Sequence, residues 1–395
     1  MKKSVLCVTV YISLFISLWG KSKDSDRKQT KREIRNHKFA YGLNSEIKEI
    51  QNQNEKAFLD YFETLSVEEK VSQLFIINLE GNRTFTPVDR RNGKPYVPGG
   101  YLFFSYNLAD TPAEVKNFTN DINAWCKKNN VIPPFLAVDE EGGYVQRLRK
   151  LAGKIPSQMD VAESRSVPEA YELYSSHAVK MDEMGFNMNL APVVEILSDY
   201  NRDFLENRSF GNLEKTRDYS IAELNGYQNN GISCVLKHFP GNTNTDPHTG
   251  LPEITLSREE LEEALVPFRR VVEHGPDAVL MSHARTSVAD SHIPACFSKY
   301  WVTEKLRKEM GFAGIIMSDD IFMGALADHG YPPETACVKA IEAGIDCIMI
   351  SEKRFAKPAE GLIKKAESDP VFASRIDESC KRILQFKIRK GIFSF

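Results

Sequence analysis

Eight short apolar runs separated by helical stretches follow residue 65, and this alternation constrains the fold more than any other feature of the chain. We expect strands at residues 73–77, 100–104, 134–138, 186–190, 233–236, 278–281, 314–317 and 347–350. We expect helices at residues 112–129, 168–184, 216–229, 257–274, 303–310, 334–343 and 375–390. Strands that alternate with helices predict a parallel sheet, because each parallel connection needs a crossover.

The number of strands and the residues that end them favour a closed sheet. Eight strand–helix units in about 330 residues fit an α/β fold of the (β/α)8 TIM-barrel type with a single catalytic domain. The runs end at polar residues, namely Asp139, Asn189, Lys237–His238, Ser282–His283, Asp319 and Ser351. A barrel gathers all of these ends on one face, whereas a doubly wound open sheet, the alternative, gathers only those beside its switch point. We therefore expect residues 65–395 to form one barrel domain.

The N-terminal region differs from the rest of the chain. Residues 1–20 have a basic start and an apolar stretch that is short for a membrane span, which is typical of a signal peptide. Leu18 and Trp19 form a poor cleavage site, so an N-terminal anchor is the alternative. Residues 21–64 are expected to be a charged linker and N-terminal extension. We expect an exported protein, periplasmic, extracellular or associated with a membrane through its N-terminus.

Composition narrows the choice of partners and cofactors. The net charge of −3 gives no electrostatic footprint for nucleic acid. Seven cysteines without a CxxC pair support neither a zinc site nor a disulfide framework, and we expect Cys234 and Cys347 to be buried. We expect a monomer that uses no metal and no organic cofactor.

Two of the expected strand ends carry residues suited to acid–base chemistry. The fifth run leads into Lys237 and His238 and then into a polar loop with Asp246 and His248, while the seventh run ends at Asp319. Alternate residues of an extended segment point the same way, so Asp246 can orient His248. A histidine can protonate a leaving group near neutral pH, and a carboxylate can attack a sugar. The alternative for Asp246 and His248 is that they belong to a polar surface loop without a catalytic role.

Six segments of the chain resemble glycoside hydrolase family 3, specifically its single-domain β-N-acetylglucosaminidases (β-hexosaminidases). They are residues 65–74, 138–148, 187–192, 208–211, 237–241 and 318–320. The resemblance covers residues 65–395, and the segments follow the order of the family. It implies a retaining exo-β-N-acetylglucosaminidase that releases terminal β-linked N-acetylglucosamine from peptidoglycan fragments or related oligosaccharides through a covalent glycosyl-Asp intermediate.

The resemblance also implies the roles of individual residues. Asp319 would be the nucleophile, and His248 the acid/base oriented by Asp246. The sugar's hydroxyl and N-acetyl groups would be held by Asp139, Arg147, Arg208, Lys237 and His238.

The chain departs from the family pattern in two places. The loop at residues 241–248 is about two residues shorter and lacks a His and an Asp, and Glu140 and Tyr144 replace a Gln and an Arg. The alternatives for function are a β-N-acetylglucosaminide phosphorylase, a family-3 β-glucosidase and a non-catalytic sugar-binding protein. The phosphorylase is included because a histidine acid does not repel an incoming anion as a carboxylate does.

Other residues at the strand ends have competing interpretations. Lys237 could form a Schiff base, although a hydrogen-bonding lysine is favoured. We expect Asp320 to anchor its loop. His283 could line the pocket or be a satisfied barrel histidine, and Glu140 or Glu141 could replace His248 as the acid.

Overall fold

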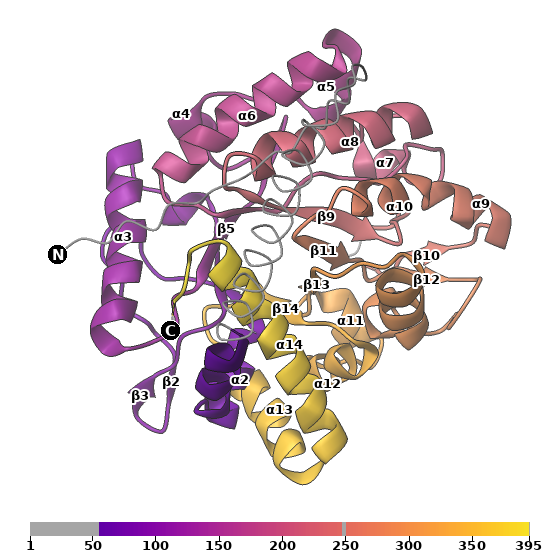
Figure 1. Cartoon of the computed structure of the whole chain (residues 1–395). Coiled ribbons are helices and arrows are strands. Elements are labelled where there is room, and N and C mark those ends of the chain that lie inside the picture. The colour runs from indigo at the N-terminus through magenta and orange to yellow at the C-terminus, as the bar shows by residue number, and fades with distance from the viewer. Residues whose placement is uncertain (1–54, 247–249, 395) are drawn as a thin grey trace, which may run out of the picture. The chain divides into compact units, whose positions relative to one another are not determined.

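Eight parallel strands close into a barrel in the computed structural model, which describes residues 55–246 and 250–394 (Figure 1). In barrel order they are β1 (Phe75–Asn78), β14 (Cys347–Ile350), β13 (Ile315–Asp320), β11 (Ala278–Met281), β9 (Ser233–Phe239), β8 (Met188–Asn189), β5 (Phe135–Val138) and β4 (Gly100–Phe103). Parallel pairing of β4 with β1 completes the circle. The predicted (β/α)8 barrel is confirmed, and the doubly wound open sheet was the wrong alternative.

The strands are buried because both of their faces are covered. Every residue of β5 and of β14 is buried, which explains why these strands read as unbroken apolar runs. Three strands continue past their predicted ends: β1 runs to Asn78, β9 to Phe239 and β13 to Asp320. The prediction stopped at the first polar side chain, but pairing between strands uses backbone groups that every residue except proline supplies.

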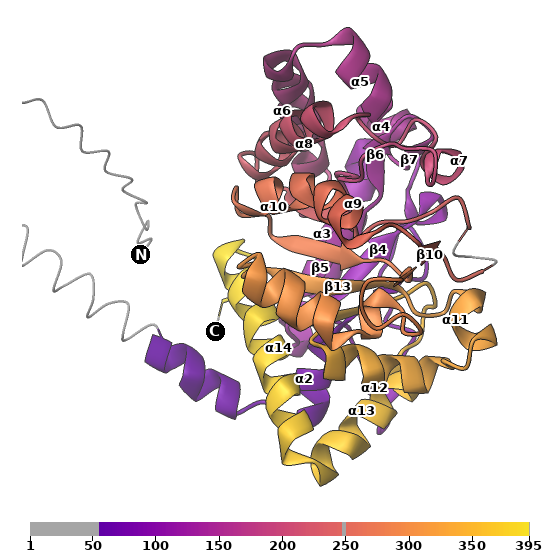
Figure 2. The ribbon, with the colours of Figure 1, turned by 90° about the vertical axis from the view of Figure 1, so that its right-hand side faces the viewer.

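Helices surround the strands in both views of the chain (Figures 1 and 2). They are α2 (Val67–Gln73), α3 (Pro112–Asn129), α4 (Arg149–Ala152), α5 (Gln158–Ser164), α6 (Val167–Glu183), α7 (Arg202–Leu205), α8 (Leu213–Gln228), α9 (Arg258–Ala264), α10 (Val266–Val272), α11 (Gly324–Asp328), α12 (Pro333–Ala343), α13 (Ala356–Ser368) and α14 (Pro370–Arg389). Two short 3-10 helices, η1 (Ser105–Asn107) and η2 (Ala295–Phe297), and a π-helix, η3 (Tyr300–Glu309), complete the set. Residues 55–63 are also helical, in a unit separate from the compact unit Leu65–Phe395.

The ends of these helices follow local sequence signals. Thr111 caps α3 by accepting a hydrogen bond from the backbone amide of Glu114, whose side chain bonds back to Thr111. The single helix predicted at residues 257–274 is instead divided into α9 and α10, because Pro267 has no amide hydrogen to continue the helical bonding.

Three small sheets lie outside the barrel. The hairpin β6 (Glu140–Gly142) and β7 (Val145–Gln146) follows β5 directly, and β10 (Glu253–Ile254) pairs with β12 (Arg285–Thr286) beyond β9 and β11. The third pair is β2 (Arg90–Arg91) with β3 (Lys94–Pro95). The first two belong to the loops that leave the carboxyl ends of the strands, so they give those loops fixed structure.

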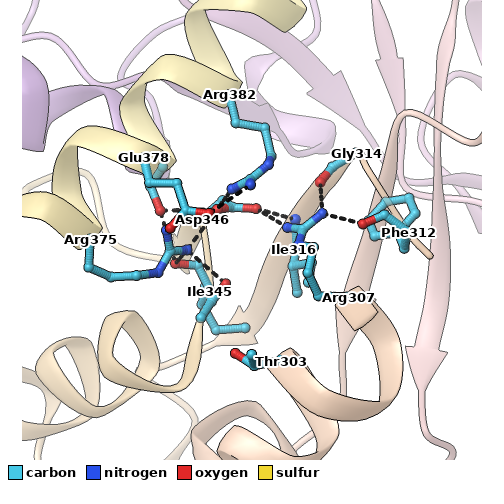
Figure 3. A network of polar contacts seen from close by, with 12 residues as sticks. Thr303, Arg307, Phe312, Gly314, Ile316, Ile345, Asp346, Arg375, Glu378 and Arg382 are labelled. Carbon is cyan, nitrogen blue, oxygen red and sulfur yellow. Dashed lines mark hydrogen bonds and ion pairs between the residues drawn. The ribbon is translucent and has the colours of Figure 1, made fainter. Parts of the chain in front are cut away.

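A buried carboxylate ties the last helix to the amino end of the barrel (Figure 3). Asp346 precedes β14, is fully buried, and accepts hydrogen bonds from Arg307 (2.6 Å), Arg375 (2.8 Å) and Arg382 (2.6 Å). Burial raises the pKa of Asp346, but the three guanidinium groups outweigh it and hold that pKa below its ordinary value. The cluster therefore joins η3, β14 and α14 at the end of the barrel away from the strands' carboxyl ends.

Two further properties concern the described residues as a whole. The cysteines at 126, 234, 296, 337, 347 and 380 are free and buried, as expected for Cys234 and Cys347. None of the helices between residues 55 and 394, leaving aside 247–249, is long and apolar enough to cross a membrane.

Candidate active site

The predicted site residues that the structure describes lie at the carboxyl end of the barrel or in the loops that leave it. Asp139 follows β5, Lys237 and His238 belong to β9, and Asp319 belongs to β13. Arg147 follows β7 and Arg208 lies in the loop beyond α7. Asp246 is exposed, and its carbonyl accepts a hydrogen bond from the Gly250 amide (3.0 Å). His248 lies outside the described residues, so the predicted dyad remains a prediction.

Lys237 is the centre of a buried charge cluster. Its ammonium donates to Asp139 Oδ1 (2.8 Å) and is 2.6 Å from Glu141 Oε1, with only 4% of its side chain exposed. Burial lowers the pKa of Lys237, but the two carboxylates outweigh this effect and raise it above its ordinary value. A Schiff-base lysine needs a neutral amine, so this environment argues against the imine alternative.

Arg208 shares the carboxylate of Glu141 with Lys237. The guanidinium donates from Nε to Glu141 Oε2 (2.8 Å) and from Nη2 to Oε1 (3.0 Å), a bidentate arrangement that fixes both groups. Burial raises the pKa of Glu141, but the positive charges of Lys237 and Arg208 outweigh it and hold that pKa well below its ordinary value. An ionised, fully engaged Glu141 cannot donate a proton, which argues against it as an alternative acid.

Glu195 is a site residue that sequence reasoning missed. Its Oε1 lies 2.7 Å from His238 Nδ1, and its Oε2 accepts from the backbone amide of Asn242 (2.6 Å). The carboxylate thereby orients the His238 ring and holds the start of the loop that carries Asp246. A signal was present: residues 190–194 are apolar and end at Glu195, and Val193 pairs with Lys237 alongside β9.

Asp319 lies partly exposed at the end of β13. Its Oδ1 accepts a hydrogen bond from the Asp320 amide (2.8 Å). Burial acts to raise the pKa of Asp319, but the charges of His283 and His238, this backbone hydrogen bond and the charge of Lys237 hold it below its ordinary value. Asp319 is therefore ionised at neutral pH, the state that a nucleophile requires.

The neighbours of Asp319 hold its loop in place. Asp320 Oδ1 accepts from the amides of Phe322 (3.0 Å) and Ser351 (3.0 Å), so the expectation that it anchors the loop is confirmed. His283 is 1% exposed, with Nε2 2.9 Å from the Asp320 carbonyl and Nδ1 3.3 Å from Cys296 Sγ. Of its two interpretations, the structure supports the satisfied barrel histidine.

Arg147 differs from the other cations of the site. Its guanidinium lies over the ring of Phe104, 5.9 Å from the centroid. Its buried Nε has no hydrogen-bond partner in the part of the chain that the structure describes. No group of three or more His, Cys, Asp or Glu side chains suited to hold a metal ion occurs within residues 55–246 and 250–394.

Comparison with known proteins assigns the chain to a family. Residues 66–386 match the family model of the glycosyl hydrolase family 3 N-terminal domain. The chain belongs to glycosyl hydrolase family 3. The family predicted from six short segments is thus confirmed, and the protein is a glycoside hydrolase.

Two beta-hexosaminidases align with most of this chain. A beta-hexosaminidase of Alkalilimnicola ehrlichii is 31% identical over 313 residues, covering 76% of this chain and 86% of the relative. Beta-hexosaminidase A of Pseudoalteromonas piscicida is 26% identical over 325 residues, and the alignment spans only 54% of that longer protein.

Solved structures share the fold. The beta-N-acetylglucosaminidase of Paenibacillus sp. str. FPU-7 has a TM-score of 0.78 at 28% identity, covering 84% of this chain and 64% of that one. The beta-N-acetylhexosaminidase of Beutenbergia cavernae has a TM-score of 0.71 at 26% identity, covering 83% and 99% of the two chains.

Proposed function

We propose that this family 3 protein is a retaining exo-β-N-acetylglucosaminidase. The observation that carries the proposal is Asp319, a carboxylate kept ionised at the barrel mouth and flanked by the Lys237 cluster. The names of the relatives support the choice of sugar. Cell-wall fragments or related oligosaccharides would supply terminal β-linked N-acetylglucosamine.

The proposed reaction has two displacements at the anomeric carbon. In the first, Asp319 Oδ attacks that carbon while the imidazolium of His248, oriented by Asp246, gives its proton to the departing glycosidic oxygen. In the second, neutral His248 takes a proton from water, and the resulting hydroxide displaces Asp319 and releases the sugar. Two inversions retain the β configuration.

The remaining side chains would hold the sugar during both steps. Lys237, locked between Asp139 and Glu141, and Arg208, locked on Glu141, present charged groups whose positions are set before substrate arrives. Groups fixed in advance need little reorganisation as charge develops at the anomeric carbon, which is the main source of electrostatic catalysis. His238 is fixed in the same way by Glu195.

Turnover of a nitrophenyl N-acetylglucosaminide tests the proposal. We expect release of nitrophenol with β-N-acetylglucosamine as the first-formed sugar, and much slower turnover of the matching nitrophenyl glucoside. A sugar 1-phosphate formed in phosphate buffer would instead show a phosphorylase. Preference for the glucoside would show a β-glucosidase, and binding without turnover would show a sugar-binding protein.

The site of action is a separate part of the proposal. We propose that residues 1–20 direct export, so that the enzyme meets cell-wall fragments outside the cytoplasm as a monomer, released or held at the membrane through its N-terminus. Fractionation of cells that express the full chain tests this. Full-length protein found in the cytoplasm with Met1 retained would contradict it.

A further inference from the structure

Glu140 stands between two active-site carboxylates but faces away from them. Its neighbours Asp139 and Glu141 both contact Lys237. The Glu140 side chain, which is fully buried, instead meets Leu148 and His177, because successive side chains of an extended segment point to opposite faces. Its backbone is held on both sides by Asn189, the last residue of β8: the Glu140 amide donates to Asn189 Oδ1 (3.0 Å), and Asn189 Nδ2 donates to the Glu140 carbonyl (3.0 Å).

Both carboxylate oxygens of Glu140 have partners. Oε2 accepts a hydrogen bond from the backbone amide of Leu148 (2.8 Å), and Oε1 lies 3.2 Å from Nε2 of His177, a buried residue of α6. Glu140 opens the hairpin β6–β7, and Leu148 follows it directly after Arg147. The carboxylate therefore closes the base of the hairpin and attaches it to α6.

This closure matters most for Arg147. Within the described residues the Arg147 side chain is held by packing over Phe104, and its Nε has no hydrogen-bond partner. Its position accordingly depends on the backbone on either side. The Arg147 amide donates to the Asp139 carbonyl over a long distance (3.4 Å), and the next backbone donor, the Leu148 amide, is held more closely by Glu140 (2.8 Å).

We propose that Glu140, supported by His177, is a positioning residue that sets the place of Arg147 in the sugar site. This inference rests on the proposed function and on the role that the family resemblance implies for Arg147, contact with the sugar. The essential property of Glu140 is acceptance of the Leu148 hydrogen bond rather than its charge.

Three substitutions at Glu140 separate these properties. Glu140→Gln keeps an oxygen that accepts from Leu148 and has an amide that can donate to a neutral His177 nitrogen, so we expect kcat/KM within about threefold of wild type. Glu140→Ala removes the acceptor and should lower kcat/KM at least about tenfold, mainly through a higher KM. Glu140→Asp keeps the charge but is too short to reach both partners, and it should resemble Glu140→Ala.

A double-mutant cycle with Arg147→Ala tests the route of the effect. If Glu140 acts through Arg147, Glu140→Ala should lower kcat/KM less than about threefold when Arg147 is already absent. Glu223→Gln is the matched control, because Glu223 is also fully buried and hydrogen-bonded, to Gln158 (2.9 Å), without any bond to the hairpin. We expect the control to keep wild-type kcat/KM.

The outcomes distinguish this inference from the proposed function. Equal losses from Glu140→Ala in both backgrounds, or a Glu140→Gln variant as poor as Glu140→Ala, would overturn the positioning role. Should Glu140→Ala fail to fold, Glu140→Gln and Glu140→Asp still decide the question by their contrast. Full turnover by both Asp319→Ala and Arg147→Ala would instead overturn the proposed function.

Discussion

Charge balance around single residues explains how the site can hold so many ionised groups. The carboxylate of Glu141 pairs with both Lys237 and Arg208, and the carboxylate of Asp139 supplies the second negative charge that balances these two cations. Paired groups of this kind are costly to separate, because each partner left behind would be an uncompensated buried charge. The proposed nucleophile is the exception, since Asp319 has no salt bridge in the described residues and relies on more distant positive charge.

Asp319→Ala is expected to leave a folded protein with almost no turnover. Removal of a nucleophile should cost about a thousandfold or more in kcat, measured with a nitrophenyl N-acetylglucosaminide and accompanied by an unchanged circular dichroism spectrum. Because the pKa of Asp319 is held below its ordinary value, the acidic limb of wild-type kcat/KM should fall below the usual carboxyl range. A variant with more than about a tenth of wild-type activity would contradict the assignment, since less than about 1.4 kcal/mol would then be involved.

His248→Ala should affect substrates with poor leaving groups far more than activated aryl glycosides, because only the former need protonation of the departing oxygen. Asp246→Ala should show the same pattern more weakly, since Asp246 orients the ring without transferring the proton. Rates on a chitobiose-type disaccharide and on a dinitrophenyl glycoside provide the comparison. The alkaline limb of kcat/KM should disappear in His248→Ala. Equal losses on both substrates would indicate a binding role instead.

The residues of the site could be predicted to different degrees. The sequence predicted three of them, Asp139, Lys237 and Asp319, because each follows an apolar run and the carboxyl ends of parallel strands lie on one face of the barrel. The contacts within the site could not be predicted, because they join residues far apart in the sequence. Glu195, for example, contacts His238 from 43 positions away. The direction of the Glu140 side chain toward α6 could not be predicted either, since only the folded barrel shows which face of its segment meets that helix.

At the scale of elements, strand positions were easier to predict than helix boundaries. All eight strands fall on predicted runs because parallel strands buried on two faces leave a strong apolar signal. The helices α4, α5, α7, α11 and α13 match none of the expected helix ranges, although Leu362 and Ile363 give α13 an apolar face. The helix expected at residues 257–274 is divided at Pro267 into α9 and α10. Helix ends depend on caps and single residues, which carry a weaker signal than a strand core.

Asp346→Ala should strongly destabilise the barrel without changing its chemistry. Arg307, Arg375 and Arg382 would lose their shared acceptor, and breaking a buried pair of this kind costs about 3–5 kcal/mol. Urea unfolding measures the loss. The variant that remains folded should keep wild-type KM, because the cluster lies at the amino end of β14.

The exposed pair Glu304–Lys308 provides the control for this measurement. Glu304→Ala should cost less than about 1 kcal/mol, because solvent screens the pair. A similar cost for the two variants would show that Asp346 does not anchor α14.

At the scale of the whole molecule, closure of the barrel is the property that the strand count predicted and that no single run could establish. An apolar run shows that a strand is buried but not which strands lie beside it, and the parallel pairing of β1 with β14 joins the first and the last barrel strands in chain order. Closure also gives the site its composition, since β5, β9 and β13 are not adjacent in the barrel yet contribute to one mouth. An open sheet with the same runs would have separated these ends.

Stability of the whole domain should depend on the protonation of Glu223. Burial raises the pKa of Glu223 to about 8 in the folded protein, whereas an exposed glutamate has a pKa of 4.5. The hydrogen bond from Gln158 opposes this rise, and the negative charge of Glu141 adds to it. Between these values the folded state keeps a proton that the unfolded state has released. The free energy of unfolding should therefore fall as pH rises through this window, by at most about 1.4 kcal/mol per pH unit.

Glu223→Gln should remove this dependence. Its amide remains neutral in both states, and its oxygen can still accept from Gln158. The variant should match wild type near pH 4.5, exceed it in stability progressively up to about pH 8, and keep a constant advantage above that. Urea unfolding at pH 5, 6.5, 8 and 9 measures the difference, with Glu304→Gln at the surface as the control that should show no such trend. A stability difference that stays flat from pH 5 to 8 would show that Glu223 is already ionised in the folded barrel.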